Sequence, residues 1–138
     1  MKQHSPGLTF SRRLAFVVGI FTPLAETIRR WRQLGEPGVW PIWFDDLLLG
    51  GFLVYAAWRT GRDPHDGQKY LAGAWGVTAG MAYGSFFGQL IRLNEPDPAP
   101  IGTAWVVGIK GLGLLLAITA LIITLRASSS RYSQKENI

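Results

Sequence analysis

Four long apolar runs separated by short polar connections limit the folds open to this chain more than any other feature. The runs cover about residues 10–31, 40–58, 70–93 and 101–125. A bilayer core is about 30 Å thick and a helix rises about 1.5 Å per residue, so each run is long enough to cross it. In lipid, backbone amides must bond within their own segment, which favours helices. The sequence therefore predicts an all-α polytopic membrane protein, a four-transmembrane-helix bundle.

Composition supports a membrane location and argues against nucleic acid as a partner. Only 17% of the 138 residues are charged, whereas 48% are hydrophobic. The net charge of +5 arises from short Lys and Arg clusters between the apolar runs, not from one basic segment interleaved with aromatic residues. The chain has no cysteine, which excludes disulfides and thiolate metal sites. The expected partner is the lipid bilayer, with no nucleic acid and no cofactor.

The connections between the runs are too short to hold a further domain. Residues 59–69 and 94–100 contain the helix-breaking residues Gly and Pro. The polar segment 127–138 is expected to be a disordered tail. A single membrane domain over residues 1–138 follows. The first run is the weakest of the four, and its alternative interpretation is a cleaved secretory signal, which would leave three spans and place the amino terminus outside.

Lys and Arg are unevenly shared between the two sides that four spans create. One side carries Lys2, Arg12, Arg13, Arg59, Arg62, Lys69, Arg126, Arg131 and Lys135; the other carries Arg29, Arg30, Arg32 and Arg92. Because cytoplasmic loops carry the excess of positive charge, we expect both termini in the cytoplasm, as in a bacterial inner-membrane protein. The dense cluster that begins at Arg29 lies outside in this arrangement and opposes it.

The third run has glycine at every fourth position: Gly76, Gly80, Gly84 and Gly88. Small residues at this spacing let helix backbones approach closely in a membrane. The groove lowers helix propensity, a cost that packing must offset. We expect this glycine zipper to seat a neighbouring helix of the same chain, and the glycines that could oppose it are Gly50, Gly51, Gly108, Gly111 and Gly113. The alternative is a face that binds another membrane protein or a second copy.

Five polar side chains fall within the predicted spans, all toward one leaflet: Glu26, Asp45, Asp46, Gln89 and Lys110. Ionisable groups at membrane depth are costly, so each is a candidate for an intramembrane polar site. Glu26 can reach Arg29 or Arg30 at helical spacing, as a local surface pair.

Asp45, Asp46 and Lys110 have two interpretations each. The aspartates either touch headgroup water near a helix start or form an ion pair with Lys110, since the topology places the second and fourth spans' first turns on one side. Lys110 lies about 13 Å into its span and can alternatively snorkel outward.

No Ser-His-Asp order, phosphate-binding glycine loop or zinc motif occurs in the sequence. We therefore expect no catalytic residues, no metal site and no enzyme activity. The leading hypothesis is a non-catalytic membrane component that packs with other spans, as an accessory subunit or a homo-oligomer. The alternative is a small-solute or proton-coupled transporter that uses Asp45, Asp46 and Lys110. A membrane enzyme acting on lipid or quinone at the Asp45–Asp46 region is a third hypothesis.

Overall fold

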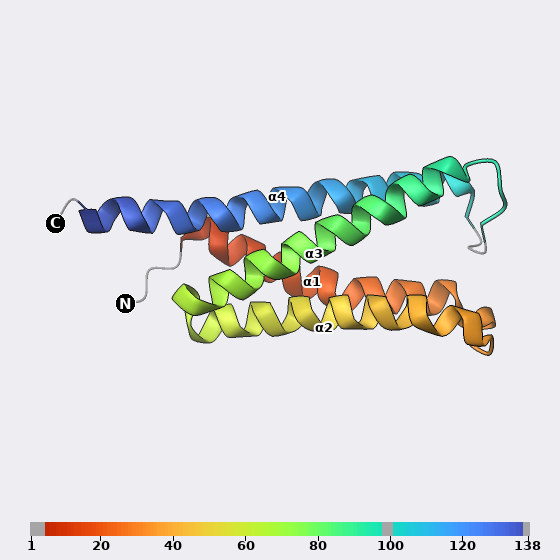
Figure 1. Ribbon diagram of the computed structural model, residues 1–138, viewed down its shortest axis with the longest axis horizontal. Helices are drawn as coiled ribbons and strands as arrows, with labels where there is room; N and C mark the ends of the chain where they lie inside the picture. The colour runs from red at the N-terminus through yellow and green to blue at the C-terminus, as the bar shows by residue number, and fades with distance from the viewer. Residues whose placement is uncertain (1–4, 98–100, 137–138) are drawn as a thin grey trace.

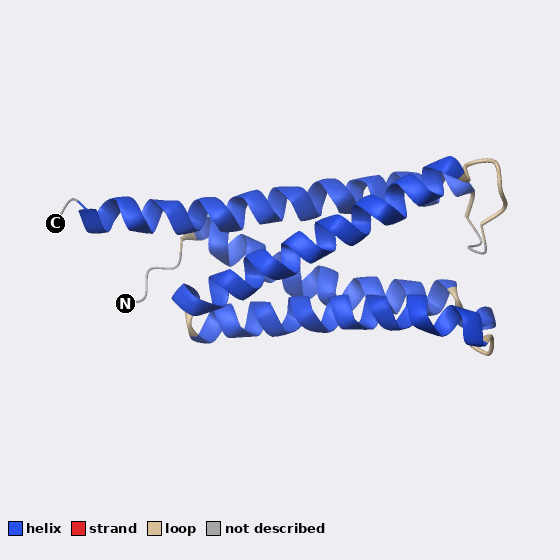
Figure 2. Ribbon diagram, viewed as in Figure 1, coloured by secondary structure: helices blue, strands red, loops and turns tan. Residues whose placement is uncertain are grey.

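The structure, a computed structural model, describes residues 5–97 and 101–136. It consists of α1 (Pro6–Arg29), α2 (Trp40–Arg62), α3 (Pro64–Ile91) and α4 (Thr103–Glu136), with two short 3-10 turns, Trp31–Gln33 and Pro37–Val39, between α1 and α2 (Figure 1). No strand occurs among the described residues (Figure 2). The predicted all-α class is therefore confirmed.

The turn between α2 and α3 is far tighter than the expected connection over residues 59–69. Only Asp63 separates the two helices. Its carboxylate accepts hydrogen bonds from the backbone amides of His65 and Asp66, at 3.0 and 3.3 Å, and Pro64 occupies the first turn of α3. A capping aspartate followed by proline starts a helix at once, so α3 begins before the first apolar residue of its run.

Helix α4 also extends further than expected. It continues through Glu136, whereas the sequence favoured a disordered tail from residue 127. This stretch contains no glycine or proline, and Ala127, Gln134 and Lys135 are good helix formers, so no residue in it ends the helix. Residues 137 and 138 lie outside the described part of the chain.

Three helical segments are long and apolar enough to cross a membrane: Pro6–Arg29, Pro37–Arg62 and Thr103–Ala127. Helix α3 is not among them, although it has 28 residues. Its run contains repeated glycines together with tyrosine and tryptophan, which add little to the mean hydropathy. Large apolar side chains such as Ile28 and Leu115 are exposed on the outside of the bundle, as lipid-facing residues are. These features are those of a multi-pass membrane protein, but hydropathy does not confirm the third predicted span.

Side-chain packing divides the bundle along its length into two halves. Helix α1 begins, α4 ends and α2 meets α3 at one end, while the other two connections lie at the opposite end (Figure 1). Every member of the buried apolar cluster lies in residues 8–15, 53–75 or 117–127. We call these stretches the packed half, and residues 16–52, 76–97 and 101–116 the open half.

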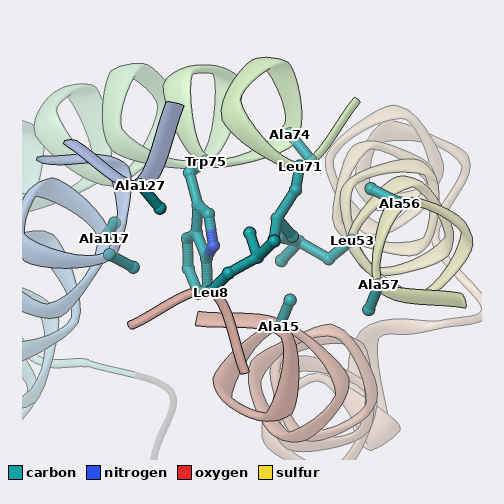
Figure 3. Packing of buried hydrophobic residues seen from close by; sticks show 11 residues of the cluster. Leu8, Ala15, Leu53, Ala56, Ala57, Leu71, Ala74, Trp75, Ala117 and Ala127 are labelled. Atoms are coloured by element: carbon teal, nitrogen blue, oxygen red, sulfur yellow. The ribbon is translucent and has the colours of Figure 1, made fainter. Parts of the chain in front are cut away.

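The core of the packed half surrounds Trp75. The indole is fully buried and lies with Leu71 of α3 among Leu8 of α1, Leu53 of α2 and the alanines of α4 (Figure 3). The small residues Ala56, Ala57, Ala74, Ala117 and Ala120 are also fully or almost fully buried. Large side chains thus fill the centre, and alanines let the helix backbones approach around them.

Polar side chains also join helices inside the packed half. The indole N–H of Trp75 donates to Ser11 Oγ at 2.9 Å, and Ser11 Oγ lies 2.6 Å from Thr124 Oγ1. The amide of Gln68 donates to the Thr124 backbone carbonyl. This network ties α1, α3 and α4 together and leaves the buried hydroxyl and indole groups with hydrogen-bond partners. Because Ser11 of α1 takes part in it, the first run is an integral member of the bundle core.

In the open half the helices remain paired two by two. The backbones of α1 and α2 are in direct contact at Gly19 and Gly50. A Cβ on Gly19 would lie 2.8 Å from the Gly50 carbonyl oxygen. Pro23 has no N–H to bond the Gly19 carbonyl, so this carbonyl is free to lie against α2. Helices α3 and α4 meet where the Phe86 ring covers Gly111. The two pairs diverge from one another toward the loop end (Figure 1).

Candidate functional site

The glycine zipper of α3 has no neighbour in the structure. A Cβ built on Gly76, Gly80, Gly84 or Gly88 would meet nothing within 4 Å. The expectation that this groove seats another helix of the same chain is therefore wrong. Of the glycines expected opposite it, Gly50 packs on Gly19 of α1 and Gly111 packs on Phe86 from the other side of α3.

The open glycines lie on a face of α3 that contacts α2 nearer the end of the bundle where α2 meets α3. A Cβ on Gly73 would lie 3.8 Å from the Phe52 ring. Gly80 and Gly84 follow Gly73 by seven and eleven residues, so at about 100° per residue they lie within about 20° of the same direction. The open glycine face thus extends the α2–α3 interface toward the loop end of the bundle, beyond the point where the two helices separate.

The opposing wall on α2 is uncovered as well. Leu48 and Asp45 precede Phe52 by four and seven residues and therefore share its side of the helix. The Leu48 side chain is 58% exposed, and Asp45 is also exposed. Helices α2 and α3 thus enclose a wedge in the open half, with glycines on one wall and Leu48 and Asp45 on the other.

A network of charged and amide side chains lies at the end of the bundle that holds the α1–α2 and α3–α4 connections. We call it the loop-end network. It consists of Glu26, Arg29, Arg30, Gln89, Asp97 and Lys110. Arg29 makes two hydrogen bonds to the Asp97 carboxylate, from Nη2 at 2.8 Å and from Nε at 3.2 Å. The Asp97 side chain is only 2% exposed and that of Arg29 14%, so this fork-shaped pair is largely removed from solvent.

Glu26 is the second carboxylate of the network. It pairs with Arg29 at 3.1 Å and with Arg30 at 2.9 Å, which confirms the pairing expected from helical spacing. All three side chains are less than one-fifth exposed, so the pair is more buried than a surface pair. Two cations of the Arg29–Arg32 cluster are therefore matched by acidic partners.

The network continues into α3 and α4 through an amide. Gln89 Nε2 donates to Asp97 Oδ2 at 3.0 Å, and Lys110 Nζ donates to Gln89 Oε1 at 3.3 Å. Lys110 thus reaches inward to α3, and a neutral amide stands between its ammonium and the Asp97 carboxylate. The expected ion pair of Lys110 with Asp45 or Asp46 is not among the ion pairs of the described residues.

The two aspartates of α2 therefore differ from the other three predicted site residues. Asp46 is half-buried and within electrostatic range of Glu26, Arg30 and Lys110. Asp45 is exposed on the wedge wall. Glu26, Gln89 and Lys110 form the network itself, Asp46 lies beside it, and Asp45 lies away from it.

Asp97 is the network residue that sequence reasoning missed. It contacts both α1 and α3, yet it lies in a connection that was considered only as a helix breaker. A signal was present, because the dense arginine cluster lies on the same side as this connection and requires acidic partners. Gly19 was also missed, although a signal was present. Gly7, Ser11 and Ala15 precede it at four-residue spacing, and Ser11, Ala15 and Gly19 are buried.

The chemistry within reach of these residues is charge pairing and hydrogen bonding. In the described part of the chain, no three His, Asp or Glu side chains gather in a way that could hold a metal ion. Comparisons of the chain with family models, with characterised proteins and with solved structures find no match.

Proposed function

We propose that all four helices cross the membrane, with both termini in the cytoplasm of a bacterial cell. Helix α2 ends at one end of the bundle and α4 begins at the other, so α3 runs the same length as its neighbours. Between Tyr70 and Ile91 it carries no charged residue, which makes crossing compatible with its low mean hydropathy. The excess of Lys and Arg at the end with the termini supports the orientation.

Single cysteines test whether α3 spans the membrane and which side each end faces, because the native chain has no cysteine. In cells, Asn94→Cys should react with a membrane-impermeant maleimide added outside, whereas Asp66→Cys should react only after the membrane is opened. Reaction of both residues from the same side would place α3 on the surface of the membrane and contradict the proposal.

We further propose that the protein is a non-catalytic helix-packing component, whose open glycine face on α3 binds a membrane-spanning helix of another subunit. The observation that carries this proposal is the absence of any atom within 4 Å of a Cβ at the four zipper glycines. Each glycine lowers helix stability by about 1 kcal/mol relative to alanine, and no contact of these glycines with the described residues offsets this cost. Close packing against another helix is what such a face offers in lipid.

Association in the native membrane tests this function. Gly80→Leu places a branched side chain in the middle of the face and should abolish co-purification and proximity transfer with the bound subunit, or with a second copy labelled with another fluorophore. The matched control is Gly51→Leu, because Gly51 is an equally open glycine on α2. A protein that is monomeric in lipid nanodiscs, and whose cellular role is unchanged by Gly80→Leu, would rule the proposal out.

Transport of a small solute or of protons is the second candidate. It is favoured by one observation, the chain of contacts that carries polar groups from Arg29 through Asp97 and Gln89 to Lys110 inside α4. Lys110→Ala and Asp46→Asn should then abolish uptake or efflux while the protein stays folded. Unchanged flux in both variants would exclude this candidate, and the control Lys69→Ala alters a cation that is outside the network.

A further inference from the structure

We propose that the bundle has a second, closed arrangement, in which residues 41–48 of α2 swing onto the open glycine face of α3 about a pivot at Phe52 and Gly73. The motion closes the wedge between the two helix pairs and requires no other protein. It therefore goes beyond the packing function proposed above and does not depend on it.

The pivot follows from where contact between α2 and α3 stops. Below it, a Cβ on Gly67 would collide with the Thr60 backbone, and Gly73 still meets Phe52. Above it, nothing touches the zipper glycines, and Leu48 is more than half exposed. One continuous helix–helix interface thus changes from closed to open at Phe52.

The register of the closed state follows from the antiparallel course of the two helices. From the pivot toward the loop end, residue numbers fall along α2 and rise along α3, and each residue advances both helices by the same distance. Asp45 lies seven residues above Phe52, and Gly80 lies seven residues above Gly73. Because seven residues bring a helix back to nearly the same direction, closure places Asp45 opposite Gly80 and Pro41 opposite Gly84. Glycines on α3 leave room for the α2 side chains that would arrive there.

Each helix pair is cohesive enough to move as one body. In the open half α1 is tied to α2 by the Gly19–Gly50 contact and by the indole N–H of Trp43, which donates to Thr27 Oγ1 at 2.8 Å. Helix α3 is tied to α4 by Gln89 and Lys110. Between the pairs, the loop-end network supplies an ion pair and hydrogen bonds in this half.

The loop-end network sets the spacing between the pairs. Arg29 of α1, the Asp97 carboxylate and Gln89 of α3 follow one another in series, so three side chains separate the two helices at this end. A nearly buried carboxylate with bonds to both pairs holds them at one separation. Loss of the carboxylate charge should therefore shift the population toward the closed state.

Engineered cysteine pairs test the closed state in the full-length protein in lipid nanodiscs. The pair Asp45→Cys with Gly80→Cys should form an intrachain disulfide under mild oxidation. Gly7→Cys with Ile123→Cys is the positive control, since a Cβ on Gly7 would lie 3.0 Å from Ile123 Cγ2, which places the two Cβ atoms within reach of a disulfide. Asp45→Cys with Ser85→Cys is the negative control, because Ser85 lies about 7.5 Å beyond Gly80 along α3 and about 120° around the helix from the Gly73 direction.

The rate of the 45–80 cross-link should rise about fivefold or more when Asp97→Asn is added, as expected for release of a partly buried ion pair. Equal rates for the 45–80 and 45–85 pairs, with and without Asp97→Asn, would overturn the proposal. Intrachain disulfides leave the protein a monomer on a denaturing gel, whereas cross-links between copies give a dimer. The monomer band thus reports closure within one chain, and the dimer band reports association between copies.

Discussion

The two halves of this bundle use the same kind of residue in opposite ways. In the packed half, alanines and one glycine bring backbones together around Trp75, and Gly67 allows α3 to lie directly on the Thr60 backbone. In the open half, four glycines in register on α3 have nothing against them. At this end a set of charges centred on Asp97 joins the helix pairs.

The difference shows that a small-residue repeat marks a face on which close packing is possible, not one on which it occurs. Close contact in lipid requires a partner backbone at the same place, since lipid chains are as apolar as the helix surface and provide no other drive. Gly50 has no small residue four positions away, yet it forms the tightest contact between α1 and α2 with Gly19, the last member of a small-residue repeat on α1. The zipper has the repeat, but no described residue lies against it in this arrangement of the helices.

The largest expected contrast is between two tryptophans. Trp75→Ala removes a fully buried side chain and should lower the free energy of unfolding by about 3–5 kcal/mol, because a large cavity remains in the packed half. Trp105→Ala, at a side chain that is 72% exposed in the open half, should change it far less. Unfolding by denaturing detergent in mixed micelles measures both. Similar losses for the two variants would show that the halves do not differ in packing.

The next contrast compares neighbouring glycines of α2. Gly50→Leu forces a side chain into the Gly19 carbonyl and the Pro23 ring and should cost about 1–3 kcal/mol or more. Gly51→Leu meets open space and should be neutral or stabilising by up to about 1 kcal/mol through helix propensity. The same detergent titration compares them, and a stable Gly50→Leu variant would show that the close contact of α1 with α2 is dispensable.

A smaller effect is expected from the loop-end network. Asp97→Asn should cost about 1–2 kcal/mol, more than an exposed ion pair because Arg29 is left half-paired out of water, and less than a fully buried one because Glu26 still neutralises it. A double-mutant cycle with Arg29→Gln isolates the coupling between the two residues. Additive effects would show that the pair does not link the helix pairs.

The smallest effect is expected inside the core. Ser11→Ala removes the acceptor of the Trp75 indole and the partner of the Thr124 hydroxyl. Hydrogen bonds between helices in a membrane contribute about 0.6 kcal/mol on average, and a buried indole left unpaired adds to this, so a loss of about 1 kcal/mol is expected. A loss as large as that of Trp75→Ala would mean that the polar network, and not apolar packing, holds the packed half together.

Local features of the sequence predicted much of this structure. The helical class is confirmed, and the pairing of Glu26 with Arg29 and Arg30 follows from a spacing of three and four residues on one helix. The early start of α3 could have been read from Asp63 and Pro64, which form a capping signal before the apolar run.

Contacts between distant parts of the chain could not be predicted from the sequence. Asp97 bonds Arg29 across 68 positions, and no periodicity links a short connection to a helix end. An ion pair of Lys110 with Asp45 or Asp46 was one of two interpretations, because these residues lie at one end of the bundle. The Lys110 ammonium instead donates to Gln89, on the helix paired with its own. Knowing which end a residue occupies does not say which neighbouring helix it faces.

By itself, then, the sequence determined that this protein is helical, which four stretches form the centres of its helices and which residues share a face of a helix. Backbone pairing in lipid, capping and helical periodicity all act over a few residues. The tertiary structure alone decided that Gly50 is covered and Gly80 is bare, and that Asp97 joins the two helix pairs. Those outcomes depend on how the helices cross and where they separate. Glycine has the same local preferences whether or not a neighbouring backbone is present, so its position in the sequence does not reveal which case applies.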